Sequence, residues 1–141
     1  MKQQYYIKAT RAGMKAGYDC FQHKMGITNH PNPDKTDKLY SDGFHLAKSV
    51  KDALFYFINA TEFYLCKPYG EVYAEDNTKI RAGGINILWK IPTGTIPAMD
   101  KANAAWDKAN AARDKAYAAI TMDMIIKMYE EYKNETTRET Q

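Results

Sequence analysis

Residues 43–58 read GFHLAKSVKDALFYFI and contain the clearest change of secondary structure in the chain. Residues 43–47 combine apolar and aromatic side chains, which predicts a short strand. Ser49 follows as a helix N-cap, with Asp52 three residues later as in a capping box. Behind the cap, apolar residues recur at the spacing of a core-facing helix: Val50, Ala53, Leu54, Phe57 and Ile58. The stretch therefore predicts a strand and then a helix of about three turns.

Further strands are predicted on both sides of this unit. Proline and asparagine dominate residues 29–34, so we expect residues 27–38 to be the least ordered part of the region. The strand before Pro92 must end there, because proline cannot donate to a sheet ladder. The predicted strands are 5–9, 21–23, 43–47, 62–67, 71–73 and 85–91. Residues 1–92 are thus expected to form an α+β domain, a small and mostly antiparallel sheet with one packed helix.

The domain is followed by a repetitive, alanine-rich segment. Three heptads follow one another: DKANAAW at 100–106, DKANAAR at 107–113 and DKAYAAI at 114–120. Alanine favours helix, and Pro97 suits a first helical turn. We therefore expect a long C-terminal helix over 97–133 and a polar tail over 134–141. At about 1.5 Å per residue this helix is roughly 50 Å long, which exceeds the ~30 Å expected for the domain.

The heptads place small side chains along one face of this helix. We expect them to form a dimer seam, composed of Ala102, Ala105, Ala109, Ala112, Ala116 and Ala119. The residues expected to contact a protein partner are Trp106, Arg113, Tyr117, Lys101, Lys108, Asp107 and Asp114. Alternatively, the helix folds back onto its own sheet, with Trp106, Ile120 and the methionines in the core. If it associates instead, removing it after Pro97 should leave a folded domain.

Composition indicates the cellular compartment of the protein and the classes of partner it is not expected to bind. The 141 residues carry a net charge of +3 without a basic cluster, so direct nucleic-acid binding is not indicated. Cys20 and Cys66 are far apart and are expected to be free thiols in a reducing compartment. The N-terminal residues lack a signal peptide, and no stretch reaches membrane-spanning length. We therefore expect a cytoplasmic protein without membrane contact.

The sequence offers little support for catalysis. His23, His30 and His45 are too scattered to predict a metal site, and neither cysteine lies in a nucleophile signature. Gly83-Gly84 is followed by no Lys-Ser/Thr pair, so it does not form a phosphate loop. His45, among apolar neighbours, is interpreted as a structural histidine. No catalytic residue, metal or cofactor is expected.

Several short motifs nevertheless carry a family resemblance. They are Tyr6 to Thr10, Gly17 to Gln22, Gly43-Phe44-His45, Gly70 to Val72 and Lys79 to Ala82. In this order they resemble an uncharacterised domain family of phages, prophages and gut bacteria marked by a Gly-Phe-His motif, over about residues 4–91. In that family a small residue and a cysteine usually follow the motif, whereas Leu46 and Ala47 stand here, so no shared thiol or metal role is carried over.

In size and repetitive helix the chain also resembles the anti-CRISPR proteins of mobile elements, in particular inhibitors of the Cas9 nuclease. That resemblance implies stoichiometric binding to a host nuclease in the bacterial cytoplasm. Together with the alanine seam, it predicts a homodimeric binding protein that is not an enzyme.

A second resemblance leads to a different class of protein. The Tyr-x-x-Ala-Thr segment and the GFHLAKS stretch loosely resemble the core of ADP-ribosyltransferases. In that family the first strand supplies a dinucleotide-binding residue and a later strand a catalytic glutamate. The matching positions here are Lys8 and Glu71, which implies an enzyme that modifies a host protein.

Overall fold

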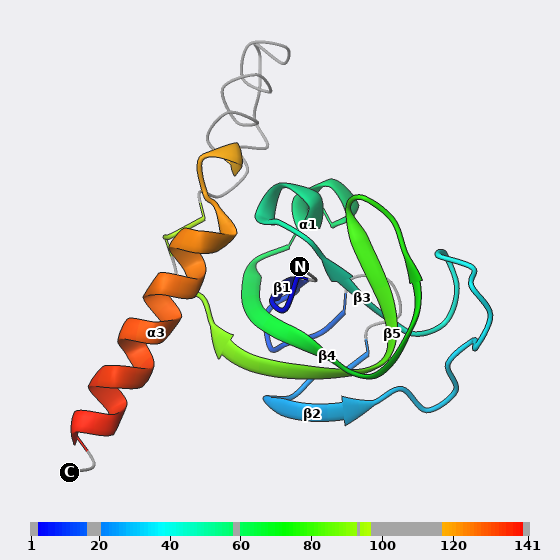
Figure 1. The fold of residues 1–141 in the computed structure, drawn as a ribbon, viewed down its shortest axis with the longest axis horizontal. Helices are drawn as coiled ribbons and strands as arrows, with labels where there is room; N and C mark the ends of the chain where they lie inside the picture. The colour runs from blue at the N-terminus through cyan, green and yellow to red at the C-terminus, as the bar shows by residue number, and fades with distance from the viewer. Residues whose placement is uncertain (1–2, 17–20, 58–59, 93, 97–116, 140–141) are drawn as a thin grey trace.

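The computed structural model describes residues 3–16, 21–57, 60–92, 94–96 and 117–139 of the chain. It confirms an α+β fold, in which a helix packs on an antiparallel sheet and a second helix follows at the C-terminal end (Figure 1). The elements in chain order are β1 (Tyr6–Thr10), β2 (Gly26–Asn29), β3 (Phe44–Ala47), α1 (Val50–Tyr56), β4 (Glu62–Glu75), β5 (Lys79–Lys90) and α3 (Met122–Glu139).

The sheet curves until it closes on itself. Its strand order is β2-β5-β3-β1-β4, every pairing is antiparallel, and β4 also pairs with β5. Strands β5, β3, β1 and β4 therefore form a ring, which is visible in Figure 1 as a strongly bent ribbon. Register shifts along the β4–β5 hairpin between Leu65 and Ala74 contribute to this bending, because a bulge increases the local bend and twist of a strand.

Over residues 43–57 the strand–helix unit is formed largely as its sequence predicts, and Ile58 lies outside the described residues. The hydroxyl of Ser49 accepts a hydrogen bond from the backbone N–H of Asp52 at 3.1 Å, which caps α1. Val50, Ala53 and Leu54 are buried as expected. The helix ends at Tyr56, however, and Phe57 is its C-cap, so α1 is shorter than the three turns predicted.

Apolar side chains pack on both faces of the ring. Neighbouring residues of a strand point to opposite faces, so adjacent apolar residues belong to different clusters. On β4, Leu65 belongs to one cluster, whereas Tyr64 and Cys66 belong to the other. The first cluster joins the ring to α1 and the C-terminal segment: Ile7, Ala47, Val50, Ala53, Leu54, Leu65, Trp89, Ile91, Tyr117 and Ile125. The second is built from the strands alone: Tyr6, Phe44, Leu46, Tyr64, Cys66, Ile80, Ala82, Ile85 and Ile87.

The C-terminal helix differs from the continuous helix predicted over 97–133. Residues 119–121 leave the helical conformation, and α3 begins at Met122 with its N-terminal turn capped by the hydroxyl of Thr121, which accepts from Met124 N–H at 3.2 Å. Because α3 continues to Glu139, most of the segment predicted as a polar tail is helical. Residues 97–116 lie outside the described part of the chain.

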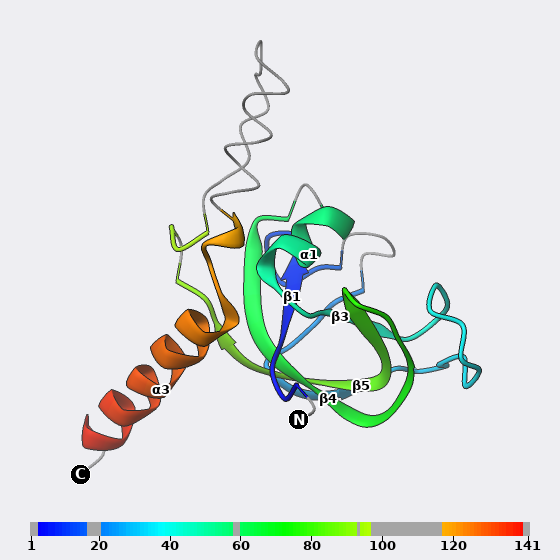
Figure 2. The same cartoon turned by 45° about the horizontal axis from the view of Figure 1, so that its top comes forward.

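The first half of α3 packs on the sheet. Ile125 is fully buried, and the ring of Trp89 contacts those of Tyr129 at 5.9 Å and Tyr132 at 5.8 Å between centroids. Residues 133–137 are exposed, and the C-terminal end of α3 projects away from the sheet (Figure 2). Over 117–132 the alternative in which the segment folds back is therefore the observed one. None of the helices described is both long and apolar enough to cross a membrane.

Three strand predictions were wrong in detail. Residues 21–23 contain a single bridge, between Gln22 and Lys15, and the second strand is β2, within the segment predicted as loop. The strands predicted at 62–67 and 71–73 are one long strand, β4, because Gly70 forms an irregularity within the hairpin rather than a turn. The strand predicted at 85–91 begins six residues earlier, at Lys79, as β5.

Candidate functional site

A cavity of about 740 Å³ lies between β1, β3, α1 and the loop before β3. Basic and aromatic side chains form much of its lining. These side chains are Lys8, Lys79, His23, His30, His45, Phe21, Phe44, Phe57, Tyr40 and Tyr56. Because small-molecule sites typically enclose about 300–1,000 Å³, this cavity is large enough for a ligand.

The Gly-Phe-His motif forms one wall of the cavity, and each of its residues has a separate role. A Cβ atom at Gly43 would lie 2.9 Å from Cγ of Arg81 and 3.1 Å from the Ala82 carbonyl oxygen, at a φ of +148°, so only glycine fits there. Phe44 is buried, and its ring packs on Phe21 and His30 at centroid distances of 5.3 and 5.2 Å. The motif thus combines close backbone packing with an aromatic wall.

His45 is held in its neutral form. Its Nε2–H donates to the carbonyl oxygen of Ser41 at 3.0 Å, which fits the structural role expected from the sequence. Nδ1 is then an acceptor, and it is buried without a hydrogen-bond partner among the described residues. Burial, and next the positive charge of Lys79, lower the pKa of His45 to about 4.

Arg81 on β5 fixes the loop that forms the other wall. Its side chain is fully buried, and its guanidinium donates to four backbone carbonyl oxygens. The acceptors and distances are Lys38 at 2.7 Å, Asp34 at 2.5 Å, Asp42 at 2.6 Å and Thr36 at 2.7 Å. Residues 34–42 were expected to lie partly in the least ordered region. The four hydrogen bonds from the planar guanidinium instead hold them against the sheet.

Lys79, at the start of β5, places a buried cation at the cavity. The residue is 5% exposed, and its Nζ lies 4.1 Å from the ring centroid of Tyr40 and 4.2 Å from that of Tyr56. Two aromatic faces therefore stabilise the ammonium by cation–π contact. Burial lowers the pKa of Lys79, and the nearby Asp76 partly opposes that shift.

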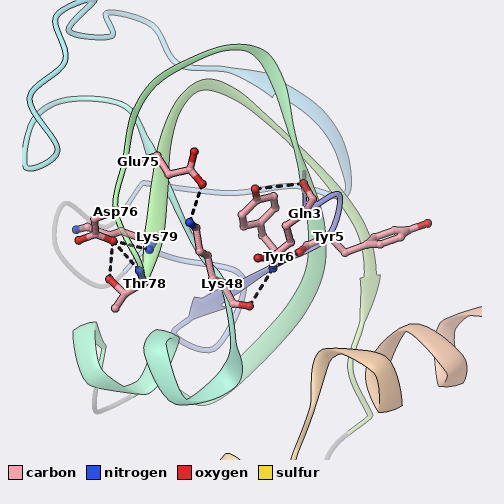
Figure 3. A network of polar contacts seen from close by, with 8 residues as sticks. All are labelled: Gln3, Tyr5, Tyr6, Lys48, Glu75, Asp76, Thr78 and Lys79. Atoms are coloured by element: carbon pink, nitrogen blue, oxygen red, sulfur yellow. Dashed lines mark hydrogen bonds and ion pairs between the residues drawn. The ribbon is translucent and has the colours of Figure 1, made fainter. Parts of the chain in front are cut away.

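The β4–β5 turn holds Lys79 in place (Figure 3). One carboxylate oxygen of Asp76 accepts from the backbone N–H groups of Thr78 and Lys79 at 2.7 and 2.9 Å. The hydroxyl of Thr78 in turn contacts that of Tyr56 at 2.6 Å. Lys48 pairs with Glu75 at 2.6 Å beside the same turn. These contacts fix the start of β5 against α1 and β3.

Aromatic residues also extend from the cavity onto the surface. Tyr40 is 73% exposed, Phe55 is 81% exposed and Tyr56 is 38% exposed. The rings of Phe55 and Tyr56 meet edge to face at 5.3 Å. We call Tyr40, Phe55 and Tyr56 the aromatic surface. Exposure of a whole phenylalanine ring suits contact with another molecule, because association would remove it from water.

The residues expected to bind a partner lie mostly outside the described part of the chain. That holds for Lys101, Asp107, Lys108, Asp114, Trp106 and Arg113, and for the seam residues Ala102, Ala105, Ala109, Ala112 and Ala116. Tyr117 is described and is 3% exposed in the core beside Trp89. Ala119 is exposed in the turn before α3.

The two residues of the enzyme alternative are not brought together at the cavity. Lys8 lines it, and its Nζ donates to the carbonyl oxygen of His45 at 3.1 Å. Glu71 is exposed on β4 and does not belong to the lining. Cys66 is a buried free thiol, and burial raises its pKa. Within the described ranges, no three His, Cys, Asp or Glu side chains gather as metal ligands.

Sequence reasoning missed Lys79, Arg81 and the aromatic surface. Lys79 and Arg81 resemble ordinary polar residues of a strand, because their partners are distant in sequence. Those of Arg81 lie in the loop before β3, and those of Lys79 lie in that loop and on α1. The segment Lys79 to Ala82 did, however, carry part of the family resemblance, and this was the signal that could have led to both.

The curved antiparallel sheet, with its Gly-Phe-His wall and arginine-tied loop, places the chain among small α+β domains. It belongs to the family described as a domain of unknown function, DUF7666, whose family model matches residues 5–101. No significant match is found among curated proteins or among solved structures. The matched range contains all the residues that line the cavity, from Ile7 to Lys79, and also Arg81.

Proposed function

We propose that the protein is a mobile-element binding protein that inhibits a host defence nuclease, of the Cas9 type, by direct contact. The observation that carries the proposal is the aromatic surface, in which Phe55 is 81% exposed. Aromatic side chains contribute much of the binding energy at protein interfaces when a partner buries them. The resemblance to anti-CRISPR proteins supports this class of target.

The proposal includes a cellular compartment and an oligomeric state. Such an inhibitor works in the cytoplasm of the bacterial host, where the nuclease is. The alanine seam supports a homodimer, since small side chains allow two helices to approach closely. In a dimer, two copies of the aromatic surface would act on one or two nuclease molecules.

A pull-down of host proteins and a DNA cleavage assay with guide-loaded Cas9 test the proposal. The full-length chain should bind the nuclease and inhibit cleavage at a stoichiometric ratio. Phe55→Ser should weaken binding at least about tenfold, because a buried aromatic anchor is lost. The ring is almost fully exposed in the free protein, so the variant should keep its fold.

Tyr69→Ser is the matched control, since Tyr69 is an exposed aromatic residue on β4, outside the aromatic surface. It should bind like the wild type. Equal binding by the wild type and Phe55→Ser, or no complex at all, would overturn the proposal.

An ADP-ribosyltransferase-like enzyme is the second candidate. The observation in its favour is that Lys8 lines the cavity, while the exposed position of Glu71 speaks against it. Label transfer from a nicotinamide dinucleotide to a host protein, abolished in Glu71→Ala, would replace the binding proposal by this one.

A further inference from the structure

Lys79 gives the cavity a positive charge that no ion pair with another described residue neutralises. In the ranges that the structure describes, no carboxylate forms a salt bridge with its Nζ. A buried ammonium is costly unless a partner compensates for the lost water, and two aromatic faces do so only in part. Lys79 is therefore suited to bind an anion.

A second ammonium stands at the same cavity. The hydrogen bond from Lys8 Nζ to the carbonyl oxygen of His45 fixes the direction of that side chain. Among the lining residues, Asp42 is the one acidic side chain, and it is exposed. Because Lys79 and Lys8 both line the cavity, a phosphate monoester, which carries two negative charges and three acceptor oxygens, suits it better than a single carboxylate does.

The aromatic wall of the cavity suits a different chemical group. His30, Phe44 and Phe21 present planar rings to the cavity, and the rings of His30 and Phe44 meet at 73° and 5.2 Å. Planar heterocycles pack on such rings, as nucleobases do on aromatic side chains. The volume of about 740 Å³ leaves room for both a phosphate and a ring system.

We propose that this cavity binds a nucleoside monophosphate. The phosphate lies beside Lys79 and Lys8, and the base packs on the ring of His30, which Phe44 supports from behind. A free nucleotide is favoured over a nucleic-acid strand, because the sequence has no run of basic residues that would follow a strand backbone away from the cavity. The proposal does not depend on the nuclease, since the ligand binds the isolated chain.

Isothermal titration of the purified full-length chain tests the proposal with four probes. They are AMP, adenosine, inorganic phosphate and a single-stranded oligonucleotide. AMP should bind in a one-to-one ratio and at least tenfold more tightly than adenosine or phosphate, because it alone engages both walls. Equal affinity for AMP and phosphate, or no binding of AMP, would overturn the proposal. Tighter binding of the oligonucleotide than of AMP would also overturn it in favour of a strand-binding site.

Variants locate the site within the chain. Lys79→Met should weaken AMP binding about 10- to 100-fold, which corresponds to the loss of a charge-assisted contact. Lys79→Arg keeps the charge and should retain most of the affinity. Lys51→Met removes one positive charge from the exposed face of α1, outside the cavity, and should leave binding unchanged.

A variant of the aromatic wall separates the two halves of the site. His30→Ala should weaken AMP binding but leave the weak affinity for phosphate unchanged, because the side chain contacts the base. Circular dichroism of each variant establishes that it is folded. If Lys79→Met is folded and binds AMP like the wild type, the cavity is not the binding site.

Discussion

At the level of single residues, His45 acquires its properties from what surrounds it. Burial has the largest effect on its imidazole and lowers the pKa; the positive charge of Lys79 lowers it further, and the hydrogen bond to the Ser41 carbonyl partly opposes both. The result is a histidine that stays neutral where an exposed one would be protonated. Its pKa of about 4 lies below the ordinary value of about 6.5.

This difference predicts a loss of stability in mild acid. Above about pH 6.5, His45 is neutral in both the folded and the unfolded chain. As the pH falls from about 6.5 to about 4, the unfolded chain binds a proton that the folded chain excludes, so the free energy of unfolding decreases. The contribution of His45 to this decrease between pH 7 and pH 4.5 should be about 2 kcal/mol. Urea unfolding at the two pH values measures it.

His45→Gln provides the control for this prediction. The glutamine amide can still donate to the Ser41 carbonyl but does not titrate, while the carboxylates of the chain titrate in both proteins. The variant should therefore lose less stability in acid than the wild type. An identical pH dependence in both proteins would show that His45 is not responsible.

At the level of elements, the loop over residues 34–42 depends on a residue from another strand. The carbonyl oxygen of Lys38 accepts from Nε of Arg81, so the peptide bond that trypsin would cleave after this lysine is held against the sheet. In Arg81→Met the four carbonyl groups lose their donors. The free energy of unfolding should fall by at least about 3 kcal/mol, and trypsin should cleave the loop faster.

Arg81→Lys separates charge from geometry in this experiment. Lysine keeps the positive charge but lacks the planar fork, so it should restore only part of the protection against trypsin. The gel assay under native conditions therefore ranks the wild type as slowest, Arg81→Lys as intermediate and Arg81→Met as fastest. Equal cleavage of all three would contradict the role of Arg81 as the anchor of the loop.

The same contrast between local and distant contacts explains what could be predicted from the sequence. The cap at Ser49 and the strand at residues 44–47 follow from patterns within a few residues, and both were found. The bond between Arg81 and a loop about forty residues earlier leaves no local pattern. For the same reason β2 was missed, because it is paired with β5 by its place in the ring rather than by strong strand residues of its own.

At the scale of the whole molecule, the C-terminal segment completes the core of the domain. The sequence suggested a domain that ends at Pro92 and a helix that projects from it. In the structure, Tyr117 and Ile125 are 3% and 0% exposed and pack in one cluster with Trp89 and Ile91. The heptad pattern could not reveal this, because it describes the helix but not the surface on which the helix packs.

A chain that ends at residue 96 should therefore be much less stable than the full-length protein, and not simply unable to associate. Losing the buried side chains of Tyr117 and Ile125 should cost about 3–5 kcal/mol, a large share of the stability of a small domain. Thermal unfolding followed by circular dichroism measures the loss, and light scattering reports association. Ile125→Ala in the full-length chain keeps the alanine seam, so it should lose stability yet remain a dimer. If the shortened chain melts within a few degrees of the full-length protein, the segment is an appendage; if the full-length chain is monomeric, the proposed dimer does not form.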